Sequence, residues 1–200
     1  MKRPLLLALA LLAPLPAAAG PLSDLVMAPG LFAAAPEGPL MAYSHVRDAP
    51  EPLTDIAAGE VRVAVAPGEA GRMLVVTREE DGETRPVAGF PGAGPNPVLL
   101  YFLESTVRAM AEATGGSPFY IRNRLRDAMA GAGLAEGAGE AVVLRPFAGD
   151  PNRGRMGAFG DLAVSLRFDP ARPDRLLELS ADTAPGEGGY HDRLVLIAED

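Results

Sequence analysis

The sequence predicts an α+β protein in which a curved antiparallel sheet of about eight strands, arranged as two meanders, packs on a central helical hairpin. Three observations predict this class. Two amphipathic helical segments follow each other in mid-chain, and strand-like segments precede and follow them in similar number. Short turns join the strands, which makes them antiparallel neighbours because a parallel return needs a dozen or more residues. A sheet with one apolar face must be covered, and the helical pair is the available cover.

The first helix is predicted to begin after Asn96, an N-cap residue, with Pro97 at the first helical position. The sequence Thr-Gly-Gly-Ser at residues 114–117 ends it. Its apolar residues recur at helical spacing and form one stripe: Leu99, Leu100, Leu103, Val107, Met110 and Ala111. A second helix begins in the same way with Ser117 and Pro118, and Gly131 stops it. Its inward-facing residues are Ile121, Leu125, Ala128 and Met129.

Eight segments have the composition of β-strands: residues 40–46, 61–65, 73–77, 85–90, 141–146, 162–168, 176–181 and 191–197. The alternation is clear where Val61, Val63 and Val65 are separated by Arg62 and Ala64, which predicts one apolar face. Residues 20–39 contain too much Pro, Gly and Ala for a long regular element. They predict an N-terminal arm that packs through a few apolar side chains.

Residues 1–19 have the three parts of a secretory signal peptide. Lys2 and Arg3 come first, an apolar run at residues 5–15 follows, and three alanines at residues 17–19 form a small-residue cleavage site. We therefore expect cleavage near Ala19 and a single globular α+β domain at residues 20–200 in the periplasm or secreted. No other segment approaches the length of a membrane helix, so we expect no integral membrane segment in the mature chain.

The composition excludes several classes of function. The chain has 18 basic and 26 acidic residues, and without Lys2 and Arg3 the remaining 16 basic residues leave a formal charge of −10. Such an acidic product is not expected to bind nucleic acid. The chain has no Cys, which excludes disulfides, zinc held by thiolates and thiol catalysis. Stability must therefore come from packing.

Parts of the chain resemble an exported protein family of alphaproteobacteria that has no assigned activity. The resemblance lies in residues 96–104 (NPVLLYFLE), 117–126 (SPFYIRNRLR), 150–153 (DPNR) and 177–182 (LELSAD), and spans most of the mature chain. It implies export, and it implies no catalytic or binding role for any residue.

Arg122 and Arg126 lie one helical turn apart, where two like charges cost roughly 0.2–0.5 kcal/mol unless an anion lies opposite them. That anion is either a protein carboxylate, such as Glu104 or Glu112, or the phosphate, sulfate or carboxylate of a ligand. The acidic composition favours a protein carboxylate. The two helices also carry more aromatic and aliphatic residues than one stripe needs. The candidate ligand-binding residues are Arg122, Arg126, Tyr120, Tyr101, Leu100, Phe102, Leu103 and Phe119.

The polar face of the first helix holds Tyr101, Glu104, Ser105, Arg108 and Glu112. Glu, Arg and Glu at spacing four form a ladder of opposite charges, and we interpret this face as solvated.

Two histidines belong to the first and last predicted strands. If these strands were adjacent, His45, His191 and Asp192 could form a metal site or an acid/base pair. A metal site usually needs a third ligand, and the sequence places none beside the two imidazoles. Such histidines are more often ordinary residues of edge strands, so we keep the shared site as the alternative hypothesis.

No motif indicates a catalytic set, a metal site or a cofactor, and we expect none of these. The turn at residues 92–97 lacks the Lys and third Gly of a phosphate-binding loop, and residues 150–154 lack the later acidic ligands of a calcium loop. The sequence favours a non-catalytic, exported module that binds an amphiphilic ligand or an envelope protein partner. The alternative is a hydrolase-like enzyme of the cell envelope that uses His45 and His191 with an arginine as anion clamp.

Overall fold

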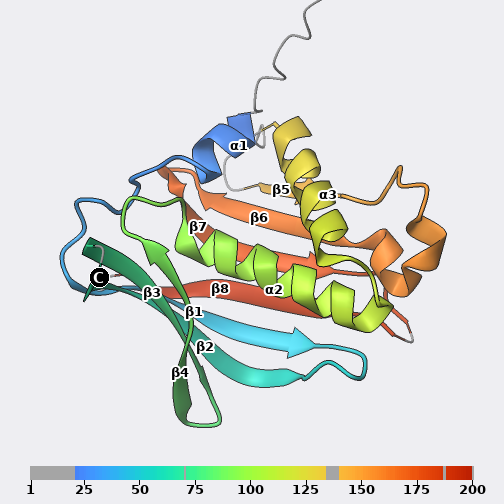
Figure 1. The fold of residues 1–200 in the computed structure, drawn as a ribbon, viewed down its shortest axis with the longest axis horizontal. Helices are drawn as coiled ribbons and strands as arrows, with labels where there is room; N and C mark the ends of the chain where they lie inside the picture. The colour runs from blue at the N-terminus through green and yellow to red at the C-terminus, as the bar shows by residue number, and fades with distance from the viewer. Residues whose placement is uncertain (1–20, 70, 134–139, 187, 200) are drawn as a thin grey trace, which may run out of the picture.

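A computed structural model describes residues 21–69, 71–133, 140–186 and 188–199, so the proposed signal peptide lies outside the described residues. Figure 1 shows the arrangement of the elements. The helices are α1 (Pro21–Val26), α2 (Pro97–Thr114) and α3 (Pro118–Gly131), with two short 3₁₀ turns, η1 (Arg153–Arg155) and η2 (Gly157–Asp161). The strands are β1 (Gly38–Asp48), β2 (Ile56–Gly68), β3 (Gly71–Glu80), β4 (Glu83–Pro91), β5 (Ala141–Leu144), β6 (Ala163–Asp169), β7 (Arg172–Asp182) and β8 (His191–Glu199).

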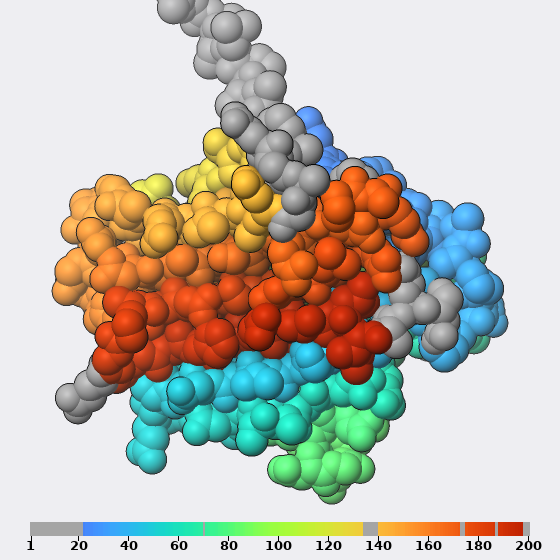
Figure 2. All heavy atoms as spheres, turned by 180° about the vertical axis from the view of Figure 1, so that it is seen from behind, coloured from blue at the N-terminus to red at the C-terminus, as the bar shows by residue number. Residues whose placement is uncertain are grey.

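The strands form one eight-stranded sheet in the order β4-β3-β2-β1-β8-β7-β6-β5, and every neighbouring pair is antiparallel. Each half is a meander of four strands, and the chain passes from one half to the other through α2 and α3. The first and last strands, β1 and β8, lie side by side in the middle of the sheet (Figure 2). The predicted α+β class, antiparallel meanders and helical hairpin are confirmed.

The helix boundaries follow from the predicted caps. The Asn96 side-chain oxygen accepts hydrogen bonds from the backbone N–H groups of Val98 and Leu99 at 3.1 and 3.2 Å. Gly115 ends α2 with φ of 65°, a conformation that glycine adopts without steric cost. Ser117 caps α3, and Pro118 occupies its first turn. Both starts therefore satisfy donors that the helix itself leaves free.

The core lies between the sheet and the two helices, which cover one face of the sheet (Figure 1). From α2 the apolar stripe contributes Leu99, Leu103, Val107 and Met110, and from α3 it contributes Ile121, Leu125 and Met129. The N-terminal arm also packs on this core through Leu22, Val26 and Phe32. Its six-residue helix and the two 3₁₀ turns are too short to give a periodic signal in the sequence. In the described part of the chain, no helix combines the length and apolar composition needed to cross a membrane.

Candidate binding groove and the polar cluster beneath it

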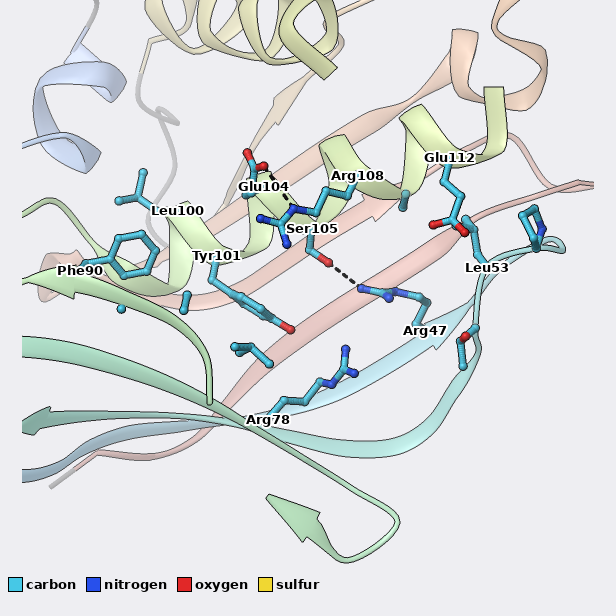
Figure 3. A pocket seen from close by; sticks show the side chains of 16 residues that line it. Arg47, Leu53, Arg78, Phe90, Leu100, Tyr101, Glu104, Ser105, Arg108 and Glu112 are labelled. Carbon is cyan, nitrogen blue, oxygen red and sulfur yellow. Dashed lines mark hydrogen bonds and ion pairs between the residues drawn. The ribbon is translucent and has the colours of Figure 1, made fainter. Parts of the chain in front are cut away.

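A groove of about 720 Å³ separates one side of α2 from the β1–β4 half of the sheet. Figure 3 shows its lining side chains. They come from β1, the β1–β2 loop, β3, β4 and α2: Arg47, Pro52, Leu53, Thr54, Arg78, Val87, Ala88, Gly89, Phe90, Leu100, Tyr101, Glu104, Ser105, Arg108, Ala109 and Glu112. The volume lies in the range of sites for small molecules.

The shape of β4 helps to form the groove. Its pairing with β3 shifts register where Val76 and Thr77 face Ala88 and Pro86, so Val87 is the extra residue of a β-bulge. A bulge bends its strand and re-aims side chains. Pro86 has no N–H to donate, and such a residue is tolerated next to a bulge on an edge strand, which β4 is. Val87 faces the groove, and α2 makes only a few close contacts with β3 and β4.

One end of the groove is apolar. Phe90 and Leu100 lie together there, and Val87 and Ala88 extend the apolar wall along β4. The middle is polar: in Figure 3 the guanidinium groups of Arg47 and Arg78 and the hydroxyl of Tyr101 point into the same space. The groove thus offers an apolar surface and hydrogen-bond donors within one cavity.

The floor of the groove is held by a cross-strand pair at the β1–β8 junction. Arg47 on β1 lies directly opposite Asp192 on β8. Its Nε and Nη2 donate to Asp192 Oδ2 at 3.1 and 2.7 Å, and Nη2 also donates to the Ser105 hydroxyl on α2 at 2.8 Å. The arginine therefore connects both central strands to the helix, and its position in the groove is fixed.

Two further side chains bind the same carboxylate. His45 Nε2 lies 2.8 Å from Asp192 Oδ1, and the Tyr190 hydroxyl donates to Oδ2 at 2.9 Å. His45 and Asp192 are each only 1% exposed. The second ring nitrogen of His45, Nδ1, is buried with no hydrogen-bond partner among the described residues.

The charges of this cluster support one another. Burial acts to raise the pKa of Asp192, but the hydrogen bond from His45 and the charge of Arg47 outweigh it, and the pKa lies below its usual value. Burial acts to lower the pKa of Arg47, but the negative charge of Asp192 outweighs burial, and the pKa of Arg47 lies above its usual value. Both groups therefore stay charged at neutral pH, and His45 donates its Nε2–H to the carboxylate.

Tyr101 and Arg78 are the donors nearest to the apolar end. Burial raises the pKa of the Tyr101 phenol, although the charges of Arg78 and Arg47 act in the opposite direction. The phenol thus keeps its proton at neutral pH and remains a hydrogen-bond donor. Arg78 forms an ion pair of 3.2 Å with Glu80, which lies two residues further along β3 and outside the groove lining.

The structure places the predicted ligand-binding residues in several different environments. Leu100 and Tyr101 line the groove. Phe102 and Leu103 point into the core and do not line it. Phe119 is 70% exposed at the start of α3. The hydroxyl of Tyr120 donates to Asp150 at 2.6 Å, and Asp150 also accepts from Arg124, so Tyr120 belongs to the contact between α3 and the 150–152 loop.

The two arginines of α3 also separate. Arg122 pairs with Glu104 of α2 at 2.9 Å, as the interpretation with a protein carboxylate predicts. Arg126 is exposed, and no described residue forms an ion pair with it. Neither side chain lines the groove.

We expect Arg122→Ala to lower the free energy of unfolding by about 0.2–1 kcal/mol, because it removes a half-exposed ion pair. Arg126→Ala should leave it unchanged or raise it by about 0.2–0.5 kcal/mol, because it removes a like charge one turn from Arg122. Urea unfolding of both variants measures the difference. A larger loss for Arg126→Ala than for Arg122→Ala would show that Arg126 has a structural partner.

The shared histidine site is contradicted. The first and last strands are adjacent, as that hypothesis requires, but His45 and His191 lie on opposite faces of the sheet. His45 is buried under α2, whereas His191 is half-exposed and pairs with Asp182 on the other face. Successive residues of a strand alternate in direction, so Asp192 and His191 cannot serve one site. Within the described ranges, no three His, Asp or Glu side chains are placed to hold a metal ion.

The polar face of α2 needs a second correction. The Glu104–Arg108 pair forms at 3.3 Å, but Tyr101 and Ser105 are part-buried and all five residues of this face line the groove. The face is therefore one wall of the groove, part-buried at Tyr101 and Ser105 and solvated, as predicted, at Arg108 and Glu112. Arg47 and Arg78, which line the groove, were not among the predicted ligand-binding residues. The available signal was the alternation of each strand, because Tyr43, His45 and Arg47 share one face of β1, and Leu74, Val76 and Arg78 share one face of β3.

No protein-family model matches the chain, and no curated protein shows significant similarity to it.

Proposed function

We propose that the protein is an exported, non-catalytic binding module that holds a small amphiphilic molecule with an anionic end in the α2 groove. The observation that carries this proposal is the placement of Arg78, Tyr101 and Arg47 beside the apolar wall of Phe90 and Leu100 in one cavity. An apolar cavity with a few convergent polar groups is the usual form of a small-molecule site. The groove holds no nucleophile beside a general base, which favours binding over catalysis.

The proposed orientation follows from the lining. The apolar part of the ligand lies against Phe90, Leu100 and Val87, where its burial supplies affinity. The anionic end lies near Arg78 and Tyr101, which supply charge-assisted and neutral hydrogen bonds. The pattern of residues 1–19 supports an envelope location, and the resemblance to exported alphaproteobacterial proteins agrees with it.

Native mass spectrometry of protein purified from the periplasmic fraction tests both parts of this proposal. The expected mass corresponds to a chain that begins near Gly20, with an amphiphilic molecule retained or with added decanoate bound. In titration calorimetry, Phe90→Ala should weaken decanoate binding about fivefold to tenfold, because it removes roughly 1–1.4 kcal/mol of apolar contact. The matched control is Phe119→Ala, which lies outside the groove and should leave binding unchanged.

Three results would contradict the proposal. A full-length chain confined to the cytoplasm would exclude export. No retained molecule together with no decanoate binding would exclude the groove as a ligand site and leave a protein partner as the function of this surface. Equal losses for Phe90→Ala and Phe119→Ala would show that decanoate binds elsewhere.

A further inference from the structure

We infer that the anionic end of the ligand is a single carboxylate on an alkyl chain, and not a phosphate ester. This inference rests on the proposed function, because it concerns the headgroup of the molecule in the same groove. It follows from the number of charges that face the groove and from the donors that remain available there.

Three arginines and two glutamates line the groove, which gives the lining itself an excess of one positive charge. Arg47 is already paired with Asp192 beneath the floor, and Arg108 with Glu104 at the rim. Arg78 remains as the cation that faces the middle of the groove, and its partner Glu80 lies outside the lining. The lining itself thus has at most one positive charge in excess, and Asp192 and Glu80 beside it remove that excess. A headgroup with two negative charges is therefore disfavoured here more than one with a single charge.

Glu112 lines the groove near Leu53, and no described residue forms an ion pair with it. A group with two negative charges would interact unfavourably with Glu112 twice as strongly as a carboxylate does, because the Coulomb energy is proportional to the charge. Glu112 thus selects against phosphate monoesters, which carry close to two charges above neutral pH.

The Arg78 guanidinium already binds Glu80 through Nη2 at 3.2 Å and the oxygen of Tyr101, and its further N–H donors suit a carboxylate. The Tyr101 hydroxyl adds one donor. The Nε and Nη2 groups of Arg47 are already engaged by Asp192 and Ser105. The donors of Arg78 and Tyr101 can bind the two oxygens of a carboxylate, but the third oxygen of a phosphate would lack a donor.

The test is a calorimetric comparison of decanoate, decyl phosphate and decanol at pH 7.5 and low salt. We expect the wild-type protein to bind decanoate about tenfold more tightly than either of the others. Arg78→Gln should remove the preference for decanoate over decanol. Glu112→Gln should raise the affinity for decanoate about twofold and for decyl phosphate about fourfold. The reason is that it removes the repulsion between Glu112 and a headgroup roughly 10 Å away, and this repulsion is twice as large for two negative charges as for one.

The control is Glu37→Gln, an exposed glutamate on the N-terminal arm outside the groove, which should change neither affinity. Tighter binding of decyl phosphate than of decanoate by the wild type would overturn the inference. Equal binding of decanoate and decanol would also overturn it, and with it the anionic end of the proposed ligand, while the groove would stand as the site of a neutral amphiphile. Failure of all three probes to bind would instead reject the proposed function, and the inference with it.

Discussion

Asp192→Asn is expected to lower the free energy of unfolding by about 3–5 kcal/mol. The carboxylate accepts hydrogen bonds from His45, Arg47 and Tyr190 at the centre of the sheet, and its side chain is 1% exposed. An amide in its place leaves the charge of Arg47 buried without a counter-charge. It also replaces one accepting oxygen with an NH2 group, which then faces N–H or O–H donors and cannot accept from them. Removal of one partner from a buried ion pair costs this much because the remaining charge is uncompensated. Urea unfolding measures the loss.

The matched control for this substitution is Asp182→Asn on the neighbouring strand. Asp182 also pairs with a histidine, His191, but their side chains are 37% and 46% exposed. We expect a loss of no more than about 1 kcal/mol, because water replaces the partner. If the two variants lost the same stability, the buried cluster would have no special role in holding β1 to β8.

The pH dependence of unfolding gives a second measure of how much Asp192 stabilises the fold. The folded-state pKa of Asp192 lies below its value in the unfolded chain, which is about 3.9 for an aspartate. The unfolded state therefore binds a proton first as the pH falls. The stabilisation is fully present above about pH 5, and it declines as the pH falls through 3.9 toward the folded-state pKa. The Asp192→Asn protein should lack this part of the acid dependence.

Much of the fold follows from local signals in the sequence. Asn96-Pro97 and Ser117-Pro118 define two helix starts, and both caps are present in the structure. Strand alternation and short turns predict two antiparallel meanders, because such turns leave no room for a parallel return. These features depend on residues close together in the chain.

The pairing of β1 with β8 depends instead on residues about 150 positions apart. Its register places Arg47 opposite Asp192 and puts His45 beside the same carboxylate. A shift of one residue would have turned Asp192 outward and His191 inward. Local patterns do not fix that register, so the sequence analysis grouped His45 with His191 and left Arg47 out.

The same limit applies to the aromatic residues of the helices. Phe102 and Phe119 are both helical and both flanked by apolar residues, and the sequence analysis proposed both as ligand lining. Phe102 lies three residues after Leu99 and four before Thr106, on the buried side of α2, so helical spacing alone is compatible with the core position. The exposure of Phe119 depends on where α3 packs, which helical spacing does not determine. Phe102 turned out to be a core residue of α2 and Phe119 a surface residue of α3.

We therefore expect Phe102→Ala to lower the free energy of unfolding by about 3–5 kcal/mol, since the side chain is 1% exposed and its removal leaves a cavity between α2 and the sheet. Phe119→Ala should change it by no more than about 0.5 kcal/mol, because water already contacts most of that ring. Urea unfolding of the two variants tests this contrast. Because neither ring lines the groove, the folded fraction of each variant should bind decanoate with unchanged affinity. A loss of affinity in folded Phe102→Ala would mean that packing beneath α2 sets the shape of the groove.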